Sequence, residues 1–198
     1  MAELEEIAQQ VRTCTDCRLA ESRTIAVPGE GPDHPALLFI GEAPGYHEDQ
    51  QGRPFVGAAG QFLEQLLASI GLRRDQVFIT NMVKCRPPNN RDPLPGEIAA
   101  CGKYLDRQVQ LLRPKVVVTL GRHSLAKFLP GATISKVHGR PRSLGSFILY
   151  PMYHPAAALH QQSLRSIVEE DFKKIPSLLT QQAKPTEEAP ASQQLSLL

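Results

Sequence analysis

Four apolar runs of strand length are spaced along the chain, at residues 36–40, 77–80, 116–120 and 147–150. They are rich in Val, Ile, Leu and Phe, and apolar residues follow one another without alternating with polar ones. Continuous runs of this kind are typical of parallel strands whose sheet is covered on both faces. The pattern therefore predicts a buried, mainly parallel, four-stranded sheet.

Helical periodicity fills much of the space between and after these runs. It covers residues 59–70, which end at Gly71, residues 96–112, which end before Pro114, and a last stretch at about 163–180. Strands that alternate with helices favour helices on both faces of the sheet. We expect an α/β protein, a three-layer α/β/α sandwich with a central, mainly parallel four-stranded sheet, in one domain over residues 1–180.

Composition agrees with one folded domain. The 198 residues are 41% hydrophobic, which suffices for a full core, and the net charge of +2 permits nucleic-acid binding without predicting it. No apolar stretch approaches the roughly 20 residues of a membrane span, and the first ten residues are acidic. We expect a soluble, cytoplasmic protein that does not bind membranes.

The four cysteines form a pattern of their own. Cys14 and Cys17 are a C-x2-C pair, and Cys85 and Cys101 lie 16 positions apart far downstream. In a cytoplasmic chain such a set favours a metal centre over disulfides, with free core cysteines as the alternative. Both zinc and a 4Fe-4S cluster take four thiolates, and spacing alone does not separate them.

Polar, Gly-rich or Pro-rich turns follow all four predicted strands, where ligands of open α/β sheets bind. They begin at Gly41, Asn81, Gly121 and Tyr153. Taken singly, each turn is a weak signal, because an Asn after a strand commonly caps a turn and a His-Pro pair is commonly a structural corner.

The combination of these turns carries more information. In order, the chain contains G-E-A-P-G-x2-E-D from Gly41, G-R-P-F-V-G from Gly52, T-N-M-V-K-C-R-P-P-x-N-R from Thr80, then L-G and M-Y-H-P. This set, with its four cysteines, closely resembles the family 4 uracil-DNA glycosylases over residues 10–180. The resemblance implies a uracil-DNA glycosylase fold, a 4Fe-4S cluster on the four cysteines, and hydrolytic removal of uracil from single- or double-stranded DNA as a step of base excision repair.

The resemblance also implies a role for several side chains. Phe55 is expected to stack on an extruded uracil, although a plain core position is the alternative. Asn81 can accept from uracil N3–H and donate to O4, which cytosine cannot match. His154 is expected to donate to O2 as charge develops there. The backbone of the first turn, at Gly41, Ala43 and Gly45, is expected to line the substrate site.

Several side chains are candidates for activating water. Ala43 stands where many relatives in the wider superfamily carry an Asp, so Glu42, Glu48 and Asn90 are the catalytic candidates. Alternatively, Glu42 only fixes the loop that it belongs to, and Glu48 fills the space near uracil C5 and so excludes the methyl group of thymine.

DNA contact requires positive charge near the site. Four basic side chains are candidates for phosphate binding, and Leu159 is the one obvious apolar side chain that could fill the place of an extruded base in the stack. The four basic residues are Lys84, Arg86, Arg140 and Arg142.

Two other functions compete with a repair hydrolase. One iron-sulfur branch of the superfamily captures uracil sites covalently through a His in an inserted basic loop, but residues 86–101 hold no His. The other is a non-catalytic DNA-binding scaffold braced by a four-cysteine zinc site. We expect a monomer that acts at the nucleoid.

The C-terminal segment has a different character. Residues 181–193 are rich in Gln, Pro, Ala and Glu and predict a disordered linker. The last five residues resemble the peptide by which bacterial proteins bind the sliding clamp, with incidental leucines as the alternative. They are Gln194, Leu195, Ser196, Leu197 and Leu198.

Overall fold

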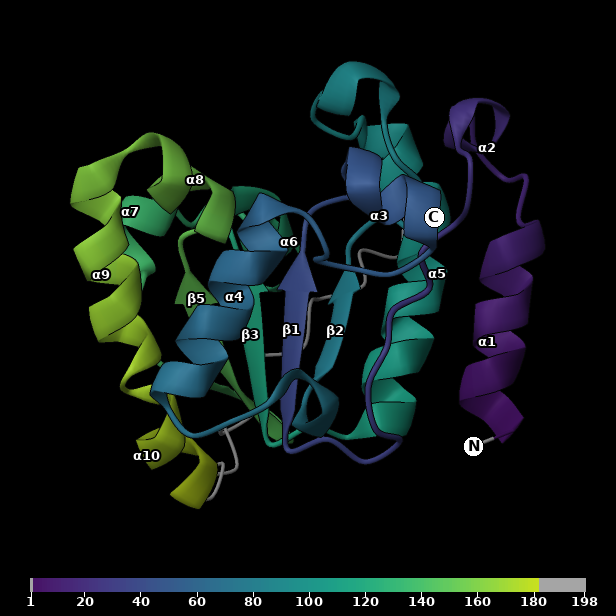
Figure 1. The fold of residues 1–198 in the computed structure, drawn as a ribbon. Helices are drawn as coiled ribbons and strands as arrows, with labels where there is room; N and C mark the ends of the chain where they lie inside the picture. Colours follow the sequence, from purple (N-terminus) through teal and green to yellow (C-terminus); the bar gives the residue numbers. More distant parts are fainter. Residues whose placement is uncertain (1, 182–198) are drawn as a thin grey trace, which may run out of the picture.

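The computed structural model describes residues 2–181 (Figure 1). The predicted linker and clamp peptide lie outside these residues. Within them, no helix combines the length and apolar character needed to cross a membrane.

The core of the fold is a sheet with strand order β2-β1-β3-β5-β4. Four of its strands correspond to the predicted runs and lie parallel: β1 (Leu37–Gly41), β2 (Phe78–Asn81), β3 (Val116–Leu120) and β5 (Phe147–Met152). Every residue of the first three is buried, as expected for strands covered on both faces. The predicted α/β class is confirmed.

A fifth strand, β4 (Arg142–Leu144), was not predicted. It pairs antiparallel with β5 across a two-residue turn that places Leu144 opposite Phe147. Gly145 in this turn has φ 58°, a conformation that glycine adopts without strain. The strand escaped prediction because it is three residues long, largely polar and at the sheet edge.

Helices cover both faces of the sheet. One face, which carries Phe39, Val118 and Tyr150, packs on α4 (Ala58–Ser69), α8 (Pro155–His160), α9 (Gln162–Phe172) and α10 (Ile175–Thr180). The other face packs on α5 (Pro95–Leu112) and α6 (Arg122–Phe128), and α1 (Ala2–Thr13) covers α5 in turn. The helix expected at about 163–180 is thus two helices, and Pro176 lies in the first turn of the second, where its missing N–H costs no hydrogen bond.

Strand register brings the strand ends level with one another. Gly41 lies opposite Asn81, and Leu120 lies opposite Met152. Around this edge lie α3 (Tyr46–Gln51), α8 and the loop with the short helix η2 (Pro88–Asn90) (Figure 1). Loops distant in sequence therefore meet at the carboxyl edge of the sheet.

Candidate active site

A pocket of about 200 Å³ opens at this edge. It collects residues from the turn after β1, the end of β2, the turn after β5, the loop before α4, and the helices α3, α4, α8 and η2. Its lining residues are Ala43, Gly45, Glu48, Phe55, Ala59, Asn81, Asn90, His154 and Ala156.

Asn81 is the last residue of β2 and is only 1% exposed. Among the described residues its side-chain Oδ1 finds no hydrogen-bond partner. Gly41 makes room for it, because a Cβ at that position would lie 2.3 Å from Asn81 Oδ1 and 2.7 Å from the Phe55 ring. A buried, unpaired acceptor is costly in a folded protein unless a ligand completes it.

Phe55 and His154 form one wall of the pocket. Their rings stack with centroids 5.5 Å apart and an interplanar angle of 25°. Phe55 is 5% exposed and also packs in the core that includes Phe62 and Leu63. The pocket and core interpretations of Phe55 are therefore compatible.

The local structure determines the protonation of His154. It is the N-cap of α8, and its Nδ1 accepts a hydrogen bond from the Ala156 backbone N–H at 3.1 Å. Burial lowers the pKa of His154 to about 4. At neutral pH the imidazole is uncharged, and since Nδ1 accepts, the ring proton is on Nε2, which can donate.

Glu48 joins two of the loops around the pocket. Its Oε1 accepts from the backbone N–H groups of Val56 and Gly57, both at 2.8 Å, and its Oε2 accepts from Gly45 N at 3.1 Å. Three N–H donors stabilise the charged carboxylate. Glu48 therefore holds the turn after β1 against the loop that carries Phe55.

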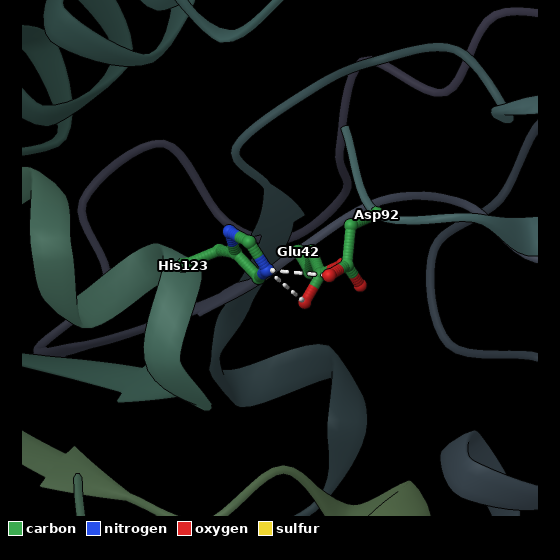
Figure 2. Close-up of side chains that lie close together, drawn as sticks. All are labelled: Glu42, Asp92 and His123. Atoms are coloured by element: carbon green, nitrogen blue, oxygen red, sulfur yellow. Dashed lines mark ion pairs between the residues drawn. The ribbon is translucent and has the colours of Figure 1, made fainter. Parts of the chain in front are cut away.

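Glu42 lies outside the pocket lining and faces two other side chains (Figure 2). His123 Nε2, from the start of α6, lies 3.7 Å from Glu42 Oε2 and 3.5 Å from Asp92 Oδ2. Burial raises the pKa of Glu42, an effect that His123 opposes and Asp92 reinforces. The predicted candidate is thus half-buried in a small ionisable cluster.

By residue type, Glu42, Asp92 and His123 could bind a metal ion, since their ligand atoms lie within 4.8 Å of one another. However, the guanidinium of Arg122 already pairs with the Asp92 carboxylate, and its Nε donates to His123 Nε2 at 3.0 Å. Two of the three candidate ligands are thus already bonded to a guanidinium, so we assign no metal here.

Asn90 reaches the pocket from η2 with φ 54°. Its Oδ1 accepts from Arg86 Nε at 2.7 Å, and the Arg86 guanidinium lies over the Tyr46 ring, 5.1 Å from the centroid. Arg86, predicted to contact DNA, therefore lies at the pocket rim.

The prediction that Lys84 contacts DNA is wrong. Lys84 is 1% exposed, and its Nζ donates to Thr80 Oγ1 at 2.6 Å, the Asn81 carbonyl at 2.9 Å and Gln108 Oε1 at 2.7 Å. Burial lowers its pKa to about 8. Three acceptors inside the fold hold this ammonium group, and a phosphate cannot reach it.

The other predicted DNA contacts lie on the surface. Arg140 and Arg142 are exposed, and Arg142 begins the edge strand β4. Leu159 is 43% exposed near the end of α8. All three side chains are accessible to a partner.

The four cysteines come together beside α1 and α5. They pack in one cluster with Ile7, Val11 and Tyr104, where Cys85 and Cys101 are buried and Cys14 and Cys17 half-buried. They share a pocket that has no lining residue in common with the pocket around Asn81. The cysteine cluster and the strand-end site are thus separate.

Three of the four sulfur atoms accept an N–H hydrogen bond. Arg23 Nη1 donates to Cys85 Sγ at 3.2 Å, Lys84 N to Cys101 Sγ at 3.3 Å, and Asp16 N to Cys14 Sγ at 3.5 Å. Burial raises the pKa of Cys101 to about 11, so a bare thiol there would stay protonated. Donors aimed at sulfur fit metal-bound thiolates, whose formation releases these protons.

Comparison with known families agrees with the fold and the motifs. A family model described as the uracil DNA glycosylase superfamily matches residues 28–177. The chain belongs to this superfamily and, by its relatives, to the type-4 uracil-DNA glycosylases.

Three relatives illustrate the similarity, and each bears the name type-4 uracil-DNA glycosylase. The protein of Sulfurisphaera tokodaii is 53% identical over 188 residues, 90% of this chain and 86% of the relative. That of Archaeoglobus fulgidus is 47% identical over 90% of this chain and 94% of its own, and that of Thermotoga maritima is 45% identical over 89% and 94%. The family predicted from the motifs is confirmed.

Proposed function

We propose that this protein is a DNA repair hydrolase that flips uracil out of DNA and hydrolyses its N-glycosidic bond, leaving an abasic site. The observation that carries the proposal is the buried Oδ1 of Asn81, which has no hydrogen-bond partner within residues 2–181 and lies in a pocket that also holds Phe55 and His154. Membership of the superfamily supports it. Only an extruded base could enter a pocket of this kind.

In this proposal Asn81 provides base selectivity. Its Oδ1 accepts from uracil N3–H, and its amide group donates to O4. Cytosine has an unprotonated N3 and an amino group at C4, so it would leave the buried Oδ1 unpaired. The Phe55 ring packs against the face of the base, and the backbone at Gly41, Ala43 and Gly45 borders it.

His154 stabilises the leaving group. As the glycosidic bond breaks, negative charge grows on the base, chiefly at O2, and the neutral imidazole donates its Nε2 proton in a hydrogen bond to that oxygen. The α8 cap at Nδ1 keeps the proton on Nε2. The donor is therefore oriented before uracil binds.

Water activation is assigned to one of Glu42, Glu48 and Asn90. Asn90 lines the pocket, and the hydrogen bond from Arg86 to its Oδ1 fixes the orientation of its amide. The Glu48 carboxylate already holds three backbone N–H groups. Single-turnover rates of the three alanine variants test the assignment, and three near-normal rates would contradict it.

We further propose that Cys14, Cys17, Cys85 and Cys101 hold a 4Fe-4S cluster. When bound, the cluster would brace the segment from β2 to α5 that carries both Lys84 and Asn81. Anaerobically purified protein should contain iron and absorb broadly at the blue edge of the visible range, and Cys101→Ala should lose iron. Stoichiometric zinc in the wild type would overturn the assignment.

DNA binding is assigned to Arg86, Arg140 and Arg142, with Leu159 as the plug that replaces the extruded base. The protein would act as a monomer at the nucleoid, in the cytoplasm.

Residues 194–198 are proposed to bind the bacterial sliding clamp. Removing them should abolish capture by the clamp in a pull-down and leave excision from short oligonucleotides intact.

The function is tested with oligonucleotides that contain one uracil. Mass analysis should find free uracil and an abasic strand, and matched cytosine and thymine oligonucleotides should stay intact. A stable protein–DNA adduct without free uracil would indicate covalent capture instead. Binding with neither product would indicate a non-catalytic scaffold.

A further inference from the structure

Arg74 belongs to none of the sequence motifs and lies in the short helix η1 (Arg74–Gln76) between α4 and β2. Its side chain is only 15% exposed. Nη1 donates to the Phe55 carbonyl at 2.8 Å, and Nη2 donates to the Pro54 carbonyl. One guanidinium thus holds two consecutive carbonyls of the loop that places Phe55 in the pocket.

Phe55 needs such support because its backbone has φ 50°, a left-handed conformation that side chains other than glycine rarely adopt. Conformations of this kind persist only where the surroundings hold them. Gly60 of α4 lies against the same peptide, since a Cβ there would be 1.9 Å from the Phe55 carbonyl oxygen. The Phe55 carbonyl therefore lies between a helix that has no side chain at that point and a fixed guanidinium.

The other side of Arg74 is tied to the sheet through Glu30. Arg74 Nε donates to Glu30 Oε1 at 2.6 Å, and the backbone of Glu30 exchanges hydrogen bonds of 3.0 and 2.8 Å with Ile79. Ile79 is a residue of β2, the strand that ends in Asn81. Arg74 and Glu30 therefore connect the Phe55 loop to the strand that carries the base-recognising amide.

We propose that Arg74 is a positioning residue for base binding, which holds Phe55 at the distance from Asn81 that a uracil ring requires. The inference rests on the proposed uracil excision. It predicts that loss of the guanidinium weakens binding of the base itself and leaves DNA backbone binding unchanged, because the Arg74 guanidinium is bonded to two backbone carbonyls and to the carboxylates of Glu30 and Glu64.

The test compares full-length Arg74→Gln and Arg74→Lys with Arg73→Gln. Arg73 is the adjacent, largely exposed arginine, whose side chain pairs with Asp75. Circular dichroism and thermal unfolding first identify which variants fold. Arg74→Lys keeps the charge and lacks the planar fork, so it decides the matter where Arg74→Gln does not fold.

Three quantities are measured for each folded variant: the single-turnover excision rate, the inhibition constant of free uracil, and the affinity for an oligonucleotide with a tetrahydrofuran abasic site. For the Arg74 variants we expect an excision rate about 10- to 100-fold lower and a uracil inhibition constant raised at least about tenfold, with abasic-DNA affinity within about twofold. Arg73→Gln should match the wild type in all three.

The outcomes separate this inference from the proposed function. If the wild type releases no uracil, the proposed function fails and this inference fails with it. If the wild type is active and folded Arg74→Lys keeps its rate and its inhibition constant, only the positioning role is overturned. A loss of abasic-DNA affinity with unchanged uracil inhibition would make Arg74 a phosphate contact and would also overturn it.

Discussion

The neutral state of His154 allows a demanding test, because one side chain both caps a helix and donates to the base. His154→Ala removes both functions. His154→Asn keeps a side-chain oxygen for the Ala156 N–H, since Asn is a favoured N-cap residue, but it cannot present the Nε2 donor. The pair therefore separates capping from catalysis.

The structure sets the magnitudes. Loss of one donor to a developing oxyanion lowers the single-turnover rate by about 10²- to 10³-fold, and both variants should show this loss. Loss of the cap costs about 1 kcal/mol, or roughly 2–4 °C in Tm for a domain of this size. His154→Ala should show this loss, whereas His154→Asn should keep most of the stability. His34→Ala, an exposed histidine ahead of β1, is the control and should change neither.

The pH dependence follows from the lowered pKa. The unfolded chain binds a proton at His154 below about pH 6.5, and the folded chain only below about 4. This contribution to stability is complete above pH 6.5 and is lost as the pH falls through 4. The contribution is on the order of 1–3 kcal/mol, since the half-buried His154 ring is partly screened by solvent, and it should be absent from His154→Ala.

The assays are single-turnover excision from a uracil oligonucleotide, thermal unfolding between pH 4 and 7, and 15N NMR of the imidazole. The NMR spectrum at pH 7 should show a neutral ring protonated on Nε2. An imidazolium at pH 6, a proton on Nδ1, or a His154→Ala rate within threefold of the wild type would refute the reasoning.

The remaining predictions concern the pocket and the DNA surface. Gly41→Ala should leave a folded protein and reduce excision at least about 100-fold, because the new methyl group overlaps the Asn81 amide and the Phe55 ring. Gly96→Ala, whose Cβ would meet nothing within 4 Å, is the matched control. Near-normal excision by Gly41→Ala would contradict the pocket geometry. Lys84→Met should leave the slope of log K against log salt for DNA binding unchanged, whereas Arg140→Ala should reduce the magnitude of this slope by about one. Equal slopes for the wild type and both variants would show that Arg140 does not contact DNA.

The sequence by itself determined the fold class. Continuous apolar runs, such as residues 116–120, can satisfy their burial only in a sheet covered on both faces, so the order of strands and helices already implied the layers. The same logic placed Asn81 and His154 at one edge, because parallel strands end together. The four cysteines could be grouped without a structure, since their residue type limits what they can do.

Tertiary structure alone decided the role of several charged side chains. Lys84 resembles a surface base in the sequence, but the fold places three acceptors around its ammonium group, one of them from α5. Arg74 likewise takes its partners from segments distant along the chain, at Glu30 and Phe55. Hydrophobic periodicity is a local property of the chain, whereas the burial and hydrogen bonding of a charged group depend on which distant segments fold against it, and no local pattern encodes that.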